Sequence, residues 1–256
     1  MCRMHDHIII FQALFLFFAG IFASTIDTIA GGGGMITLPS LMSIGLPPAT
    51  ALGTNRLQGC IAEMTAAFRF HRQGHIQLKE LWLGFILTAC GGALGAVAIM
   101  ALHPDHLQKI LPFCLLIIFV YFLLSPSLRN DQVKRRLSPT AFYLMIGTLI
   151  GFYNGFFGPG TGSIWILALM YFMGLPMNKA VMQAKPFNTV GNLASLICFA
   201  IQGHVAYWTL LVMAPGQIIG ASMGAQLVMK HGTRLVRPMF IVVFAVLMAK
   251  LFYSAY

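Results

Sequence analysis

The sequence predicts an all-α polytopic membrane protein built from two inverted repeats. Three observations carry this prediction: the chain is strongly apolar, glycine- and proline-rich breaks interrupt its apolar runs, and its second half repeats the first. Hydrophobic residues make up 58% of the 256 residues, charged residues only 9%, and the mean hydropathy is +0.82. A soluble chain carries about a quarter charged residues. Several runs of about twenty apolar residues are long enough to cross a bilayer. The sequence lacks the alternation of apolar and polar residues that would indicate a β-barrel.

The apolar runs divide the chain into two sets of predicted helices. Each set contains four long spans and one short element, which gives eight to ten transmembrane segments. The first repeat, residues 8–125, is predicted to contain 8–29, 35–46, 49–70, 78–101 and 107–125. After a basic linker at 126–139, the second repeat, 140–254, is predicted to contain 140–157, 163–174, 178–200, 207–229 and 235–254. The two short elements cannot cross alone as straight helices. Each either crosses deep inside the protein or turns back.

A displacement of 129 positions aligns the second half with the first. The turn sequence Gly45-Leu46-Pro47 matches Gly174-Leu175-Pro176. Arg56 matches Lys185, so each half carries a cation at the same place in its apolar sequence. Internal repeats whose helices are broken at matching positions are typical of secondary transporters.

Loop charges predict that the two repeats are inverted. The loop at 69–79 holds three basic residues, whereas its counterpart at 198–208 holds no Lys or Arg. The basic segment 230–237 likewise matches 102–106, which has none. Because basic loops stay in the cytoplasm, matched loops are expected on opposite sides, with 69–79, 230–237 and the linker at 125–139 in the cytoplasm. Inversion requires an odd number of crossings per repeat, and five crossings that include the short element satisfy this requirement.

The remaining composition excludes several other classes of protein. The net charge is +10, and the basic residues lie at the ends of the predicted spans, as is usual in membrane proteins. They do not form the basic stripe that would indicate nucleic-acid binding. The five cysteines are scattered singly, so neither a disulfide framework nor a metal site is predicted. The glycine clusters lack the Gly-Lys-Ser/Thr sequence that ends a phosphate-binding loop. We therefore expect no metal and no cofactor.

The glycine clusters themselves are the predicted centre of function. Gly31–Gly34 in the first half, and Gly158, Gly160 and Gly162 in the second, permit positive φ and close approach of backbones. Irregular backbone within hydrocarbon persists only where it is buried in protein or lines a wet cavity. A helix that begins there directs N–H groups and partial positive charge at an anion. The alternative is that these glycines only permit tight helix packing, which the sequence favours for isolated glycines and not for matched clusters.

Polar residues that follow the breaks complete the predicted anion site. A cation within a span costs about 2.5–3.5 kcal/mol and therefore usually faces a cavity or a partner; the alternative is snorkelling to the interface. Neighbouring amides and hydroxyls suit the oxygens of an oxyanion. The predicted substrate-binding residues are Gly31, Gly32, Gly33, Gly34, Thr54, Asn55, Arg56, Gln58, Gly160, Thr161, Gly162, Lys185, Asn188 and Asn192.

Two carboxylates, Asp27 and Glu63, also lie in apolar sequence. Either is a candidate to carry a coupling proton, and either could instead pair with Arg56 or another cation. Glu63 follows Arg56 by seven residues, which places both on roughly the same helix face.

Three segments of the chain carry a family resemblance: GGGGMITLPSLMSIGLPPATALGTNRLQ, GFYNGFFGPGTGSIWILALM and GLPMNKAVMQAKPFNTVGNLAS. They resemble the TauE/SafE sulfite-exporter-like permeases over nearly the whole chain. The resemblance implies a multi-pass inner-membrane permease that moves small sulfur-containing anions, such as sulfite and organosulfonates, outward. Arg56 stands where the family motifs often show lysine. The positions that match the motifs are Gly31 to Gly34, Pro39, Gly53, Thr54, Asn55, Gly158, Gly160, Gly162, Lys185 and Asn188.

Two rival functions are also compatible with the sequence. An anion channel would use the same pathway without alternating access. An intramembrane hydrolase would use Ser163 as nucleophile, with His204 elsewhere in the same half. Because Ser163 matches Gly34 and both His204 and its counterpart His75 follow a turn glycine, we expect a transporter and no enzymatic activity.

Overall fold

The computed structural model describes residues 2–102 and 134–231, which form helices and contain no strand. The helical class is therefore confirmed for these two ranges. The first consists of α1 (Cys2–Ala30), α2 (Gly34–Ser43), α3 (Pro48–Arg72), η1 (Leu78–Leu81) and α4 (Trp82–Met100). The second consists of α6 (Pro139–Phe142), η2 (Tyr143–Gly147), α7 (Thr148–Phe156), α8 (Thr161–Met173), α9 (Met177–Ile201) and α10 (Trp208–His231). The predicted elements 107–125 and 235–254 and most of the linker 126–139 lie outside the described residues.

The same turn ends both short helices, as the repeated Gly-Leu-Pro sequence requires. Gly45 and Gly174 have φ of 93° and 66°, the left-handed conformation that terminates helices. Pro47 and Pro176 then take extended backbone, with ψ of 148° at each, and cap the helix that follows. The long helices α3 and α9 therefore begin at matching positions of the two halves.

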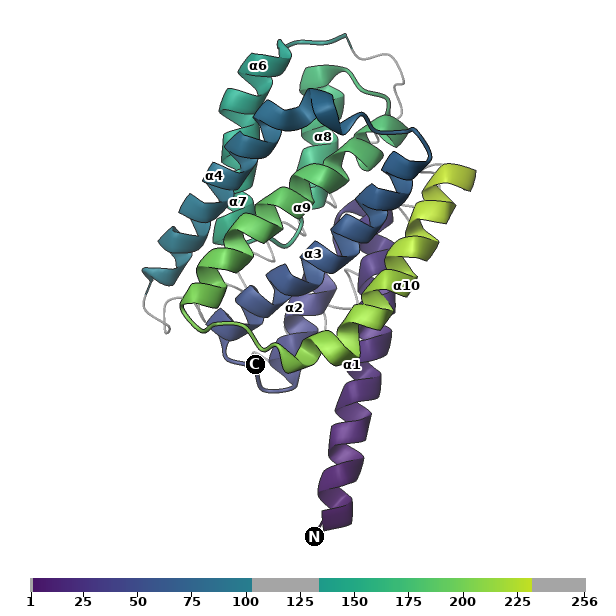
Figure 1. The fold of residues 1–256 in the computed structure, drawn as a ribbon, viewed down its shortest axis with the longest axis vertical. Helices are drawn as coiled ribbons and strands as arrows, with labels where there is room; N and C mark the ends of the chain where they lie inside the picture. The colour runs from purple at the N-terminus through teal and green to yellow at the C-terminus, as the bar shows by residue number, and fades with distance from the viewer. Residues whose placement is uncertain (1, 103–133, 232–256) are drawn as a thin grey trace, which may run out of the picture.

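Helices of the two halves pack on one another in exchanged pairs. The main contacts join α1 to α10, α4 to α7, and α3 to α9 (Figure 1). By the displacement of 129 residues, α1 corresponds to α6–α7 and α4 to α10. The first two contacts are thus the same pairing with the halves exchanged, and α3 packs on its own counterpart. A two-fold relation between the halves produces this pattern.

Isolated glycines bring the paired helices into backbone contact. A Cβ added to Gly95 of α4 would lie 2.0 Å from the carbonyl oxygen of Phe152 in α7. A Cβ on Gly220 of α10 would lie 2.1 Å from the carbonyl oxygen of Ile21 in α1. These glycines therefore have the packing role that small residues commonly play between membrane helices.

Neither short helix extends from one end of the molecule to the other. The N–H groups of Arg136 and Leu137 donate to the carbonyl of Phe172 at 2.9 and 3.1 Å, so α8 ends beside the residues that precede α6. Figure 1 shows α8 running from the middle of the molecule to its upper end and α2 from the middle to the lower end. The physical reason is length, because the 13 residues of α8 extend only about 20 Å.

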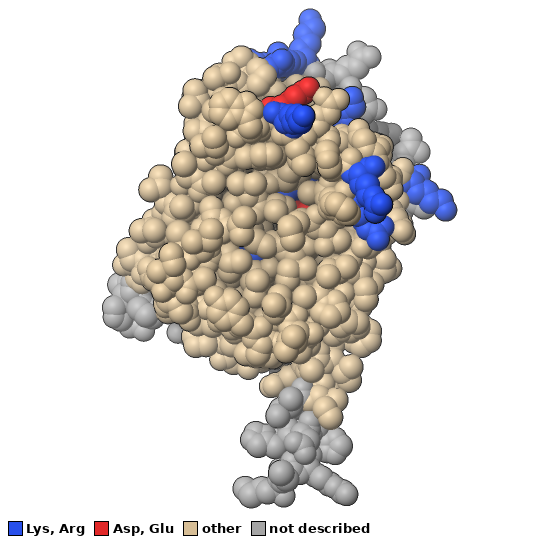
Figure 2. Space-filling view, in the orientation of Figure 1, with Lys and Arg blue, Asp and Glu red and all other residues tan. Residues whose placement is uncertain are grey.

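The surface is apolar over most of its height. In the part of the chain that the structure describes, three helical segments are long and apolar enough to cross a membrane: Ile10–Ala30, Leu78–Met100 and Trp208–Lys230. Figure 2 shows Lys and Arg gathered towards the upper end of one face, above a broad belt of uncharged residues. The loop after α3, the start of α6 and the end of α10 lie at this upper end, whereas the loop from α9 to α10 lies at the lower end.

Candidate anion-binding site

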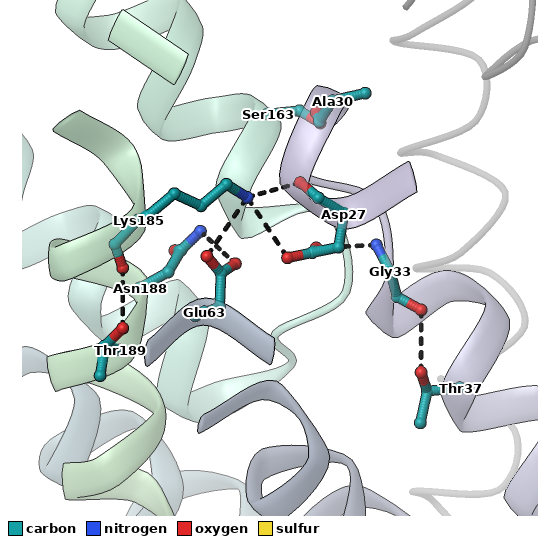
Figure 3. A network of polar contacts seen from close by, with 9 residues as sticks. All are labelled: Asp27, Ala30, Gly33, Thr37, Glu63, Ser163, Lys185, Asn188 and Thr189. Carbon is teal, nitrogen blue, oxygen red and sulfur yellow. Dashed lines mark hydrogen bonds and ion pairs between the residues drawn. The ribbon is translucent and has the colours of Figure 1, made fainter. Parts of the chain in front are cut away.

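A pocket of about 430 Å³, part of which is open solvent, lies where the two glycine breaks meet. The breaks touch through their backbones, since a Cβ on Gly31 would lie 2.3 Å from the carbonyl carbon of Gly162. The Ser163 hydroxyl also donates to the Ala30 carbonyl across this contact (Figure 3). The pocket is lined by Ala23, Ser24, Asp27, Gly31, Gly33, Gly34, Thr37, Asn55, Arg56, Gly59, Ala62, Glu63, Asn154, Gly158, Gly160, Thr161, Gly162, Asn188, Asn192 and Gln217.

Twelve of the sixteen residues singled out in the sequence line this pocket, so the breaks and the polar residues that follow them do converge. The exceptions are Gly32, Thr54, Gln58 and Lys185. The Thr54 hydroxyl accepts the N–H of Ala206 at 2.9 Å, and Gln58 Nε2 donates to the Thr209 hydroxyl at 3.1 Å. These two side chains tie α3 to the start of α10, outside the pocket.

Arg56 is a buried cation with neutral partners. It is 1% exposed, and its Nη1 donates to Asn154 Oδ1 at 3.1 Å and its Nη2 to the Gly155 carbonyl at 3.4 Å. Its Nε has no hydrogen-bond partner, and no carboxylate of the described residues forms an ion pair with it. A buried charge without a counter-charge is costly. An anion in the pocket would supply that counter-charge.

The second break brings its backbone directly against this guanidinium. Gly158 has φ of 89°, and a Cβ there would lie 1.5 Å from Nη1 of Arg56. Gly160, at φ of 82°, is the N-cap of α8. The N-terminus of α8 and the Arg56 side chain thus border the same pocket, and both favour negative charge.

Lys185 has a different environment from that of its counterpart Arg56. Its Nζ lies 3.3 Å from Asp27 Oδ2 and 3.2 Å from Glu63 Oε2, and it donates to the Asp27 carbonyl (Figure 3). Asn188 Nδ2 donates to Glu63 Oε1 at 3.0 Å. Glu63 therefore pairs with Lys185, and the pairing with Arg56 that the sequence left open is absent from the described residues.

The two breaks differ chemically although their sequences match. At the first break, the N–H of Gly33 donates to Asp27 Oδ1 at 2.8 Å, so the chain's own carboxylate occupies the N-terminus of α2. The residue that matches Asp27 in the second half is Phe156, and the residue that matches Glu63 is Asn192. The second break therefore has no such carboxylate.

Sequence reasoning missed four polar residues of the pocket, the hydroxyl residues Ser24 and Thr37 and two amides. Asn154 is 1% exposed and holds Arg56, and Gln217 of α10 is 2% exposed. Each stands alone in an apolar run near a glycine or proline. The signal was the isolated amide itself, in a position where hydrocarbon would disfavour it.

We predict that replacing Lys185 by glutamine destabilises the fold by about 3–5 kcal/mol, because Asp27 and Glu63 then face each other without a cation. Thermal unfolding of the purified protein measures this loss. The double variant K185Q/E63Q should recover part of it, and K179Q, at an exposed position of the same helix, should be neutral. A K185Q variant as stable as the parent would contradict the ion-pair assignment.

The chain is similar to known membrane transporters. The model of the family described as sulfite exporter TauE/SafE matches residues 16–251. The chain is 42% identical to a "Probable membrane transporter protein" of Haemophilus influenzae, over 93% of this chain and 94% of that protein. It is 41% identical to "Probable membrane transporter protein YfcA" of Escherichia coli K12, over 94% and 90%. No solved structure matches it. The chain therefore belongs to the TauE/SafE family of membrane transporters.

Proposed function

We propose that this protein is a secondary transporter that moves small sulfur-containing anions, such as sulfite and organosulfonates, outward across the inner membrane. The observation that carries the proposal is Arg56, which is buried in the pocket wall without a carboxylate partner among the described residues. The description of the matching family model supports the choice of a sulfur oxyanion. The guanidinium suits such a solute because its planar fork can bind two oxygens of one group.

Helix ends and amides would complete the binding of the anion. The N-terminus of α8 borders the pocket at Gly160–Gly162, and Asn55, Asn188 and Asn192 also line the pocket. Hydrogen bonds to an ionised group are about twice as strong as neutral ones. A dehydrated oxyanion would therefore find donors on several sides, whereas a neutral solute would leave Arg56 uncompensated.

The arrangement of the helices supports alternating access by two inverted repeats, 8–125 and 140–254, in a multi-pass protein. The exchanged pairs α1–α10 and α4–α7 indicate a two-fold relation between the halves. The loops after α3 and α9 match in sequence and lie at opposite ends of the molecule in Figure 1. Rocking of one repeat against the other around a central site is the usual mechanism of such folds.

Inversion predicts that Gln73 and Gln202 lie on opposite sides of the membrane. Both are exposed, end their helices α3 and α9 as C-caps, and are 129 positions apart. In a cysteine-free background, a membrane-impermeant maleimide applied to intact cells should label Q202C and not Q73C, and permeabilisation should make Q73C reactive. Labelling of both from outside would contradict the inverted arrangement.

Transport in proteoliposomes tests the function directly. We expect saturable exchange of sulfite, sulfoacetate or thiosulfate that a solute on the opposite side accelerates, as a carrier requires, and no flux of uncharged glycerol. Single-channel currents carried by these anions would instead favour a channel. Absence of binding and flux for every sulfur anion tested would overturn the proposal.

A further inference from the structure

When a solute anion is bound, the negative charges of the pocket outnumber its positive charges. The charged side chains of the site are the buried cations Arg56 and Lys185, the buried carboxylate Glu63 and the partly buried carboxylate Asp27. These four charges cancel when the pocket holds no solute. A bound monoanion would leave the site with one excess negative charge, away from water, which is unfavourable.

Glu63 is the group best placed to remove this excess. Both oxygens of Asp27 are engaged, one by the N–H of Gly33 at 2.8 Å and the other by Lys185 at 3.3 Å. Glu63 Oε1 accepts a hydrogen bond from Asn188, but its Oε2, although 3.2 Å from the ammonium, has no hydrogen-bond partner. Glu63 also lines the pocket. A proton on Oε2 would leave Asp27 and Lys185 as a neutral pair.

We propose that Glu63 binds one proton together with each monoanion, so that the protein carries the two as an electroneutral pair. This inference rests on the proposed function, because it requires an anion in the pocket. The proton moves from water to Glu63 Oε2 as the anion binds and is released when the anion leaves. Two carboxyl groups that share one buried site commonly hold a proton between them.

The surroundings of Glu63 leave few other groups that could take this proton. The charged and titratable groups facing it are Asp27 of α1 and Lys185 of α9, with Arg56 and Cys60 on α3 itself. The helix α2 has no titratable residue, and those of the described parts of α8 and α10 belong to the last turns of these helices.

An electroneutral pair has a consequence for the direction of flux. The membrane potential exerts no force on it, so the combined gradients of anion and proton set the direction. Export then proceeds when the anion accumulates inside the cell far enough to exceed the opposing proton gradient.

Proton uptake on anion binding tests the assignment. The probe is a sulfonate monoanion, methanesulfonate or isethionate, which keeps one negative charge at any working pH and so takes up no proton itself. Calorimetric titrations in buffers of different ionisation enthalpy should give one proton per anion bound for the wild type. E63Q should bind the anion with no proton uptake, and E80Q, at an exposed acid in η1, should behave as the wild type.

The matching position of the other half indicates that E63Q can fold, because a neutral amide, Asn192, occupies it. Infrared difference spectra of the wild type give a second readout that needs no variant: a protonated carboxyl band should appear when the anion binds. Anion binding by the wild type without proton uptake, or one proton still taken up by E63Q, would overturn the inference alone. Failure of every sulfur anion to bind would overturn the proposed function and the inference with it.

Discussion

Replacing Arg56 by glutamine is expected to lower anion flux at least about 100-fold. A hydrogen bond to a charged group contributes about 1.5–3 kcal/mol, and 1.4 kcal/mol corresponds to a factor of ten. Loss of two such bonds from one guanidinium to the solute therefore removes binding over the working range of concentration. R56K should retain part of the flux, because it keeps the charge and loses the two-pronged geometry.

The same variant should leave the fold intact, which separates it from K185Q. Removing Arg56 breaks no ion pair among the described residues, because both carboxylates pair with Lys185, so we expect little loss of stability. The matched control is R72Q, which changes the same residue type at an exposed position of the same helix. Flux in proteoliposomes and thermal unfolding in detergent, measured side by side, check both statements. Wild-type flux by R56Q would refute the role of Arg56.

The sequence predicted best those residues whose polar groups are energetically costly within a membrane. Arg56, Lys185 and Glu63 are conspicuous because each places a charge in apolar sequence, which hydrocarbon penalises by several kcal/mol. The glycine clusters are conspicuous for the same reason, since they expose backbone groups. Composition and these interruptions predicted the helices and the meeting of the breaks at one pocket.

Helix geometry explains why some polar neighbours of Arg56 do not line the pocket. Thr54 and Gln58 are four residues apart and share a face that bonds Ala206 and Thr209. Asn55, Gly59 and Glu63 repeat at the same spacing one position further along, and they line the pocket. Polarity and nearness in sequence do not distinguish the two faces of α3, whereas the period of the helix does.

The distribution of the carboxylates could not be predicted, because it depends on which helices approach one another. Asp27 is on α1, Glu63 on α3 and Lys185 on α9, and only their packing brings the two acids to within 3.3 Å of one ammonium. The matching of Arg56 with Lys185 suggested equal roles for these cations. The two halves differ at the acids, whose counterparts are Phe156 and Asn192. The sequence does not show which of the two cations the acids contact.

The contact between the two breaks predicts the largest effect on folding. Ala at Gly31 requires φ of 79°, and its Cβ would lie 2.3 Å from the backbone of Gly162 and Ser163. The strained φ alone costs about 1–2 kcal/mol. The backbones of two helix breaks would also have to separate, which would open the Ser163 hydrogen bond to Ala30. We expect G31A to yield little monodisperse protein and no anion binding.

Alanine substitutions at two other glycines separate the effect of backbone strain from the effect of steric contact. Gly45 has φ of 93° and nothing within 4 Å of an added Cβ, so G45A tests strain alone and should cost only the 1–2 kcal/mol of a left-handed alanine. Gly162 lacks a positive φ, but its Cβ would lie 2.5 Å from Cα of Gly31, so G162A tests contact alone. If contact dominates, thermal unfolding should rank G162A well below G45A and G31A lowest. Equal stability of G31A and G45A would mean that the two breaks do not touch, and the pocket between them would lose its structural basis.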